Sequence, residues 1–268
     1  MDYMKEYTRW CALAKGLDAD VEQELAAIQG EEEKIQDAFY RDLAFGTGGL
    51  RGVIGAGTNR MNVYTVAKAS QGLANYVRKH FAAADRRIAV SRDSRIKSDL
   101  FAETAASVFA ANGIDVYMYE DIMPTPCLSF ATRALHCAAG IMLTASHNPA
   151  KYNGYKAYGP DGCQMTDEAA DIVYQQIQKT DVITGAKYMS FAEGVNKGLI
   201  QFVEDDCKNA LYEAIEARQI RPGIAATSGL KLVYSPLNGT GLVPVTRVLN
   251  DIGIHDITIV PEQEYPNG

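Results

Sequence analysis

The sequence predicts an α/β protein with a mostly parallel sheet. Short apolar runs alternate with segments of helical periodicity from about residue 87 to residue 179, and this order is typical of strands joined by covering helices. The composition fits a globular protein, because 47% of the residues are hydrophobic and 22% are charged. The length of 268 residues corresponds to about two domains.

The charge balance and the cysteines limit the partners and the compartment. The 26 Lys and Arg residues against 33 Asp and Glu give a net charge of −7, which argues against nucleic acid or a membrane surface as a partner. Five scattered cysteines without a C-x-x-C pair indicate reduced thiols rather than a disulfide framework or a zinc site. With no long apolar stretch and a charged amino terminus, we predict a cytoplasmic protein without a membrane span or signal peptide.

The first part of the chain is predicted to be helical. Apolar residues recur at helical spacing over residues 3–43, so we expect a helical amino-terminal extension over 1–40. The glycine-rich segment Phe45–Gly52 is predicted to form neither helix nor strand because its backbone is too flexible. Helical spacing returns over residues 62–83.

The central part alternates between strands and helices. Strands are expected at 87–91, 115–119, 138–143 and 152–158, and helices at 98–112, 124–135 and 166–179. Residues 180–202 are weakly patterned and contain three glycines, which favours a domain boundary there.

The alternation resumes after this boundary and then stops. We expect a helix at 203–218, a strand at 230–234, a turn at 235–241, a helix at 242–251 and a strand at 256–260. This stretch is short for a domain of its own. We therefore interpret the chain as the amino-terminal part of a longer protein.

A polar hexapeptide, Thr144-Ala-Ser-His-Asn-Pro149, follows the apolar strand at 138–143. A hydroxyl at the end of such a strand lies where α/β sheets place their sites. Ser146 lacks the G-x-S-x-G context of a serine hydrolase. Because His147, Lys156 and arginines occur around it, Ser146 better suits a phosphoryl carrier, whose phosphate needs cationic donors.

Two other clusters can supply such donors. Gly46–Gly52 offers backbone N–H groups and Arg51, but it is neither a dinucleotide fingerprint nor a Walker A loop, which disfavours a kinase or nucleotide enzyme. Arg92 and Arg95 follow the strand at 87–91, and their planar guanidinium groups suit phosphate. A local pair between an arginine and Asp93 is an equally good interpretation of that segment.

Three motifs together resemble the α-D-phosphohexomutase superfamily of phosphoglucomutases and phosphomannomutases. They are Phe45–Gly52, Thr144–Pro149 and Tyr152–Lys156, in that order, while 91–95 and 234–241 look like further landmarks. The resemblance runs from about residue 40 to the end. It implies a three-layer α/β/α domain with a mixed, mostly parallel sheet over 41–200, carrying the phosphoserine loop, and the start of a second similar domain over 201–268.

The resemblance also implies a reaction and its residues. Phosphate would move between C1 and C6 of a hexose, or C1 and C5 of a pentose, through phosphoserine at Ser146 and a bound sugar bisphosphate. Lys156 would act as general acid and base, with His147 as the second candidate, and Arg51 would contact the transferring phosphoryl group. The remaining predicted contacts with phosphate or substrate are Thr47, Gly48, Asn148, Arg92 and Arg95.

The implied cofactors are Mg²⁺, with the phosphate on Ser146 as one ligand, and a sugar 1,6-bisphosphate as activator. The family's Asp-x-Asp-x-Asp-Arg metal loop does not occur in this sequence, so we expect the chain to be inactive alone and its incomplete second unit to fray or self-associate. The expected ligand is a small sugar phosphate. The alternative interpretation is a non-catalytic module that binds phosphate or a sugar phosphate.

Overall fold

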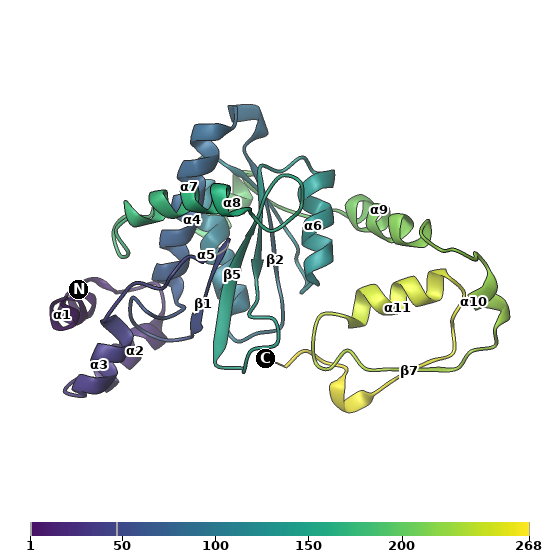
Figure 1. Cartoon of the computed structure of the whole chain (residues 1–268), viewed down its shortest axis with the longest axis horizontal. Helices are drawn as coiled ribbons and strands as arrows, with labels where there is room; N and C mark the ends of the chain where they lie inside the picture. Colours follow the sequence, from purple (N-terminus) through teal and green to yellow (C-terminus); the bar gives the residue numbers. More distant parts are fainter. Residues whose placement is uncertain (1, 47, 268) are drawn as a thin grey trace.

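The computed structural model describes residues 2–46 and 48–267, and its centre is a six-stranded sheet flanked by helices (Figure 1). The sheet has the order β1-β5-β4-β2-β3-β6. Strands β2, β3, β4 and β6 are parallel, whereas β5 runs antiparallel to both β4 and β1. The strands are β1 (Gly49–Val53), β2 (Arg87–Arg92), β3 (Asp115–Met118), β4 (Ala139–Leu143), β5 (Tyr152–Tyr158) and β6 (Ile200–Phe202). The predicted α/β class with a mixed, mostly parallel sheet is confirmed.

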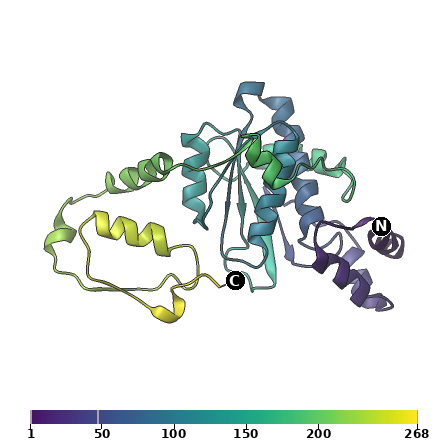
Figure 2. The same ribbon diagram turned by 180° about the vertical axis from the view of Figure 1, so that it is seen from behind.

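Helices cover both faces of this sheet, and three more form the amino-terminal extension (Figure 2). The extension consists of α1 (Tyr3–Leu13), α2 (Ala19–Ala27) and α3 (Glu32–Phe39). The helices around the sheet are α4 (Val63–His80), α5 (Ser98–Ala111), α6 (Thr125–Ala134), α7 (Asp167–Gln178), α8 (Phe191–Asn196) and α9 (Asp205–Glu216). The extension is anchored by Trp10, which is fully buried against the rings of Phe39 and Tyr64.

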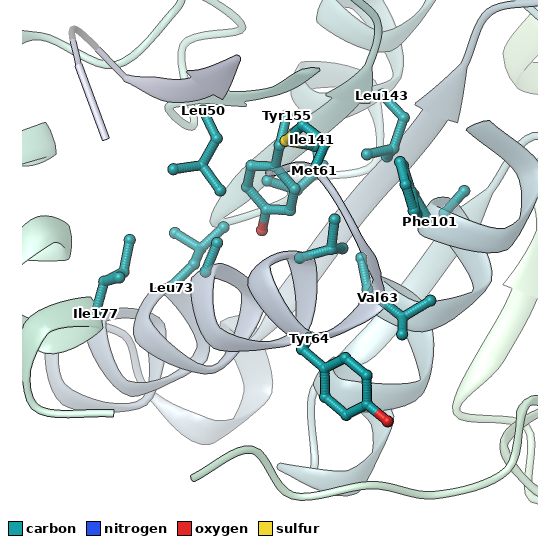
Figure 3. Packing of buried hydrophobic residues seen from close by; sticks show 14 of the residues in the cluster. Leu50, Met61, Val63, Tyr64, Leu73, Phe101, Ile141, Leu143, Tyr155 and Ile177 are labelled. Atoms are coloured by element: carbon teal, nitrogen blue, oxygen red, sulfur yellow. The ribbon is translucent and has the colours of Figure 1, made fainter. Parts of the chain in front are cut away.

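The larger core lies between the sheet and helices α4 and α5. Tyr155 of β5 points towards α4, where its hydroxyl accepts a hydrogen bond from Ser70 at 3.3 Å, and Leu73 and Phe101 lie in the same layer (Figure 3). On the opposite face, α6 packs on β2 and β4, and α9 packs on α6. The side chains of Cys207 and Leu211 of α9 belong to this second buried cluster.

Strand β1 corrects the prediction that the glycine-rich segment lacks regular structure. A Cβ atom at Gly49 would lie 2.3 Å from the carbonyl oxygen of Tyr155, so only glycine permits β1 to pair this closely with β5. The glycines therefore serve strand pairing at this point. Their composition, which is typical of loops, concealed the strand.

The segment 180–202 also contains more structure than its weak pattern indicates. It includes α8 and the short strand β6, which pairs in parallel with β3 and extends the sheet. The predicted boundary at residue 200 falls where β6 begins. The division into 41–200 and 201–268 stays a prediction.

The carboxy-terminal unit, residues 218–267, is a small separate layer (Figures 1 and 2). Two parallel strands, β7 (Leu232–Tyr234) and β8 (Ile257–Ile259), pair only with each other among the described residues. The unit also contains α10 (Ile224–Thr227), α11 (Leu242–Asp251) and the 3₁₀ turn η2 (Pro261–Gln263). Outside this unit, another 3₁₀ turn, η1 (Ala83–Asp85), precedes β2. None of the helices in the described part of the chain is long and apolar enough to cross a membrane.

Candidate active site

Loops from neighbouring strands meet at one edge of the sheet. Because β2 and β4 are parallel neighbours, the loop after Arg92 lies beside the loop after Leu143. These two loops line a cavity of about 630 Å³, together with the start of α6 and the turn 237–240 of the carboxy-terminal unit. The predicted phosphoserine loop therefore faces a cavity large enough for a small ligand.

Ser146 lies in this cavity with its side chain exposed. Its backbone is left-handed, with φ of 55°, a conformation that L-residues other than Asn and Asp rarely adopt. The Ser146 N–H donates to the Oγ1 of Thr144 at 2.9 Å, and the Ser146 Oγ lies 3.4 Å from the Nδ1 of His147. The hydroxyl is accessible, and the backbone that carries it is held by the preceding threonine.

Two cations occupy one face of the adjoining strands. Arg51 of β1 is paired with Gly154 of β5, and Lys156 lies two residues further along β5, so both side chains leave the sheet on the same side. Within residues 2–46 and 48–267, neither side chain has a hydrogen bond or an ion pair to an acidic group. Burial and then the charge of Arg51 lower the pKa of Lys156, while Asp93 opposes this effect. This face therefore favours an anion.

Asn148 and His147 are also placed beside Ser146. Both line the cavity, and the Asn148 Oδ1 atom is buried without a hydrogen-bond partner in the described structure. A buried acceptor without a donor is energetically costly, but this oxygen is closed off from the cavity, so a ligand could reach it only if the Asn148 side chain moved. His147 is exposed, with its ring beside the Ser146 hydroxyl.

The two arginines predicted as phosphate contacts are used differently. Arg92 donates to the carbonyl oxygens of Tyr119 and Glu120, at 3.3 and 3.0 Å, and so joins the ends of β2 and β3. All four terminal N–H groups of Arg95 are directed to backbone carbonyl oxygens of the phosphoserine loop. In the described structure Arg95 thus has no terminal N–H group free for phosphate, so these contacts do not support its predicted role as a direct ligand, which stays a prediction. The alternative interpretation, a local pair with Asp93, is present at 3.7 Å.

The glycine-rich segment contains two further residues predicted to contact phosphate, Thr47 and Gly48. Gly48 is buried, with φ of 69°, and its carbonyl oxygen accepts from the Ala157 N–H at 2.7 Å. The carbonyl group of Gly48 is therefore used in the pairing with β5. Thr47 lies outside the described residues, so its predicted contact stays a prediction.

The residues that are described do not form a magnesium site by themselves. No group of three or more His, Cys, Asp or Glu side chains converges on a common point anywhere in 2–46 or 48–267. Asp93, the carboxylate beside the phosphoserine loop, is already bonded to Thr144, Ser98 and the Arg95 backbone. The expected Mg²⁺ would need further ligands, and its binding stays a prediction.

Sequence reasoning missed Asp93 and Thr144 as members of this site. Asp93 lies between the two arginines, where it reads as their salt-bridge partner, and Thr144 lies at the end of a strand. The signal that could have found them is position, because each follows a buried parallel strand at the same sheet edge.

Comparison with known proteins assigns the family. Residues 42–183, more than half of the chain, match the family model described as phosphoglucomutase/phosphomannomutase, alpha/beta/alpha domain I. The chain therefore belongs to the phosphoglucomutase/phosphomannomutase family, as the resemblance of its motifs implied.

Individual relatives agree with this assignment. A phosphoglucomutase of Staphylococcus saprophyticus is 33% identical over 237 residues, which are 88% of this chain and 42% of the relative. A probable phosphoribomutase of Schizosaccharomyces pombe is 38% identical over 87% of this chain and 40% of its own length. The fold matches the crystal structure of a putative phosphomannomutase from Thermus thermophilus with a TM-score of 0.69 and 24% identity, over 85% of this chain and 47% of that one. The chain thus spans about two fifths of the length of these curated relatives.

Proposed function

We propose that this chain is the phosphoryl-carrying part of a sugar-phosphate mutase, with Ser146 as the residue that accepts and returns the phosphoryl group. The observation that carries the proposal is the placement of an exposed serine hydroxyl in a cavity at the carboxyl ends of the strands. Lys156 is the register partner of Met142, which lines this cavity, and neither Lys156 nor Arg51 is paired with an acidic group among the described residues. Membership of the phosphoglucomutase/phosphomannomutase family supports the class of reaction.

The residues divide the chemistry between them. Phosphoryl transfer depends mainly on positioning and on neutralising the charge of the phosphoryl group. Arg51, exposed and unpaired in the described structure, is suited to contact that group. Lys156 in its neutral form would accept the proton of the attacking sugar hydroxyl, with His147 as the second candidate. Asn148, which lines the cavity, would orient a hydroxyl.

The proposed net reaction moves phosphate between C1 and C6 of glucose or mannose, with the sugar 1,6-bisphosphate as the bound intermediate and activator. A pentose phosphate, moved between C1 and C5, is a second substrate class, supported by the name of the probable phosphoribomutase from S. pombe. Mg²⁺ would neutralise charge on the phosphoserine. Residues 1–268 contain no Asp-x-Asp-x-Asp-Arg sequence, so we expect one phosphorylation event rather than steady turnover. A cytoplasmic location stays part of the proposal.

The direct test is the mass of the protein. Incubation of residues 1–268 with glucose 1,6-bisphosphate and Mg²⁺ is expected to add about 80 Da, the mass of one phosphoryl group. Peptide mass spectrometry would place it on Ser146. Ser146→Ala removes the acceptor oxygen and is expected to abolish the gain while leaving the fold intact, because the change is small and exposed.

Ser94 provides the matched control, since it lines the same cavity from the neighbouring loop. Ser94→Ala should still take up one phosphoryl group. Uptake by Ser146→Ala, or no uptake by the unmodified chain, would favour the alternative, a module that binds sugar phosphates without chemistry.

A second prediction concerns the proton. Transfer from phosphoserine to a sugar hydroxyl requires neutral Lys156, so its rate should rise as the pH increases through the lowered pKa of this lysine. Lys156→Met should retain the phosphoserine, transfer more slowly and lose that rise. Quenched-flow measurement of phosphoserine decay after addition of glucose 1-phosphate would record both.

Lys151 is the control for charge alone, because it is exposed immediately before β5, the strand that carries Lys156, and lies near the Tyr152 ring. Lys151→Met should keep the pH dependence of the parent. An unchanged pH profile in Lys156→Met would transfer the acid/base role to His147.

A further inference from the structure

Arg95 makes four hydrogen bonds to backbone carbonyl oxygens of the phosphoserine loop. Its Nη2 donates to the carbonyl oxygens of Ser146 at 2.6 Å and Asn148 at 2.5 Å. Its Nη1 donates to those of Pro149 and Tyr152, both at 3.0 Å. The side chain is only 11% exposed. One guanidinium group therefore fastens both ends of the loop that runs from Ser146 to Tyr152.

We propose that Arg95 is a positioning residue for the phosphoryl carrier, acting through the backbone of the loop and not through contact with phosphate. This inference rests on the proposed function of Ser146. It differs from the sequence-based prediction, in which Arg95 binds phosphate directly, because the four terminal N–H groups are already used by carbonyl oxygens.

Asp93, two residues earlier, holds the same loop from its other side. Its Oδ2 accepts from the Thr144 hydroxyl, whose oxygen in turn accepts from the Ser146 N–H at 2.9 Å. Its Oδ1 accepts from the Arg95 N–H and from Ser98 Oγ, each at 3.1 Å. Arg95 thus fixes the carbonyl group of Ser146. Asp93 fixes the N–H group of Ser146 through the Thr144 hydroxyl.

The backbone of Ser146 explains why such fixation is required. Its φ of 55° lies in the left-handed region, which costs energy for a residue with a side chain. Hydrogen bonds to the carbonyl oxygen and from the N–H of this residue offset this cost and fix the direction of the Cα–Cβ bond that carries the Oγ atom. In-line phosphoryl transfer depends on that direction, because the attacking and leaving oxygens must lie on one line.

Lysine cannot replace this arrangement. Its ammonium group carries its donors on one nitrogen, whereas the planar guanidinium of Arg95 presents two nitrogens that each reach two carbonyl oxygens. A charge-conserving substitution therefore separates geometry from electrostatics. If Arg95 acted only as a positive charge near phosphate, lysine would largely suffice.

The experiment follows the rate at which residues 1–268 gain phosphate on Ser146 from glucose 1,6-bisphosphate with Mg²⁺. Arg95→Lys and Arg95→Ala are each expected to slow this step about 100-fold, the scale of an ångström-sized misplacement. Millimolar guanidinium should restore at least about tenfold to Arg95→Ala, since it replaces the missing donors. A wild-type rate in Arg95→Lys, or absence of rescue by guanidinium, would overturn the proposal.

Arg86 supplies the matched control. It also donates to backbone carbonyl oxygens, those of Phe81 at 3.2 Å and Arg78 at 3.0 Å, but it lies just before β2, at the opposite end of that strand from Arg95. Arg86→Ala should keep the phosphorylation rate within about twofold of the parent, because it is distant from the site of transfer. A loss equal to that of Arg95→Ala would show a general effect on stability and overturn the proposal.

A second readout separates this inference from the proposed function. Amide hydrogen exchange in the unphosphorylated chain should become faster at Ser146 and its loop in Arg95→Ala, remain unchanged in α4, and return towards the parent rate with guanidinium. If the parent chain takes up no phosphate, the proposed function fails while this measurement still judges the role of Arg95. Unchanged exchange at Ser146 would refute that role.

Discussion

The first sheet and the carboxy-terminal unit are built from similar sequence patterns but differ in burial. All five residues of β4 are buried, whereas β7 and β8 contain no buried residue. Val90 in the first sheet is fully buried, and Val233 in the second is 73% exposed. A run of apolar residues therefore indicates where a strand forms. How much the strand stabilises the fold depends on the helices and strands that cover it.

The neighbours of each strand account for this difference. Strand β2 pairs with β3 on one side and β4 on the other, and helices α5 and α6 pack on it. Strand β7 pairs with β8 alone in the part of the chain that the structure describes. Each strand of this pair consequently has an open edge, which is a site for pairing with another chain. The apolar residues most exposed there include Ile220, Val233, Leu237 and Tyr265.

Two matched substitutions, Val90→Ala and Val233→Ala, test this comparison, and Val90→Ala should lower the unfolding free energy more. Removing two methyl groups from a fully buried position costs burial and leaves a cavity, together about 2 to 3 kcal/mol of unfolding free energy. Urea denaturation would measure it through the fluorescence of Trp10, the only tryptophan in the sequence and a fully buried side chain. A loss of unfolding free energy below about 0.5 kcal/mol would show that the first sheet is packed more loosely than the full burial of Val90 indicates.

Val233→Ala removes the same two methyl groups from an exposed strand and should have the smallest effect, within about 0.5 kcal/mol. Calorimetry of the whole chain at two protein concentrations would test it. A destabilisation equal to that of Val90→Ala would mean that β7 is covered in solution. If that destabilisation also depended on concentration, the cover would be a second copy of the chain, as the predicted self-association requires.

Much of the fold could be predicted from the sequence because its central strands are apolar and its helices periodic. The expected strand at 152–158 and the expected helix at 166–179 agree closely with β5 and α7. Strand β1 was missed because its pairing depends on the absence of side chains at Gly48 and Gly49, which reads as flexibility. Strand β6 was missed because three residues are too few to show a period.

The candidate site was predictable in its location but not in its hydrogen bonds. The strand before Thr144 indicated where the polar loop would lie, and the motif supplied Ser146 and Lys156. Nothing in the residue types of Arg92 and Arg95 distinguishes an arginine that binds phosphate from one that binds carbonyl oxygens. That distinction depends on which backbone groups the folded loop leaves without partners.

The order of strands in the sheet has a consequence for how the chain folds during synthesis. Strand β1 is made early, but its pairing partner among the described strands is β5, and the opposite edge is completed by β6. Strands β2, β3, β4 and β5 are all synthesised after β1 and before β6. Such long separations in sequence raise the contact order and slow folding, in contrast to the local contacts of the amino-terminal helices. A nascent chain shorter than about 200 residues thus lacks β6 and leaves one side of β3 unpaired, an edge open to aggregation.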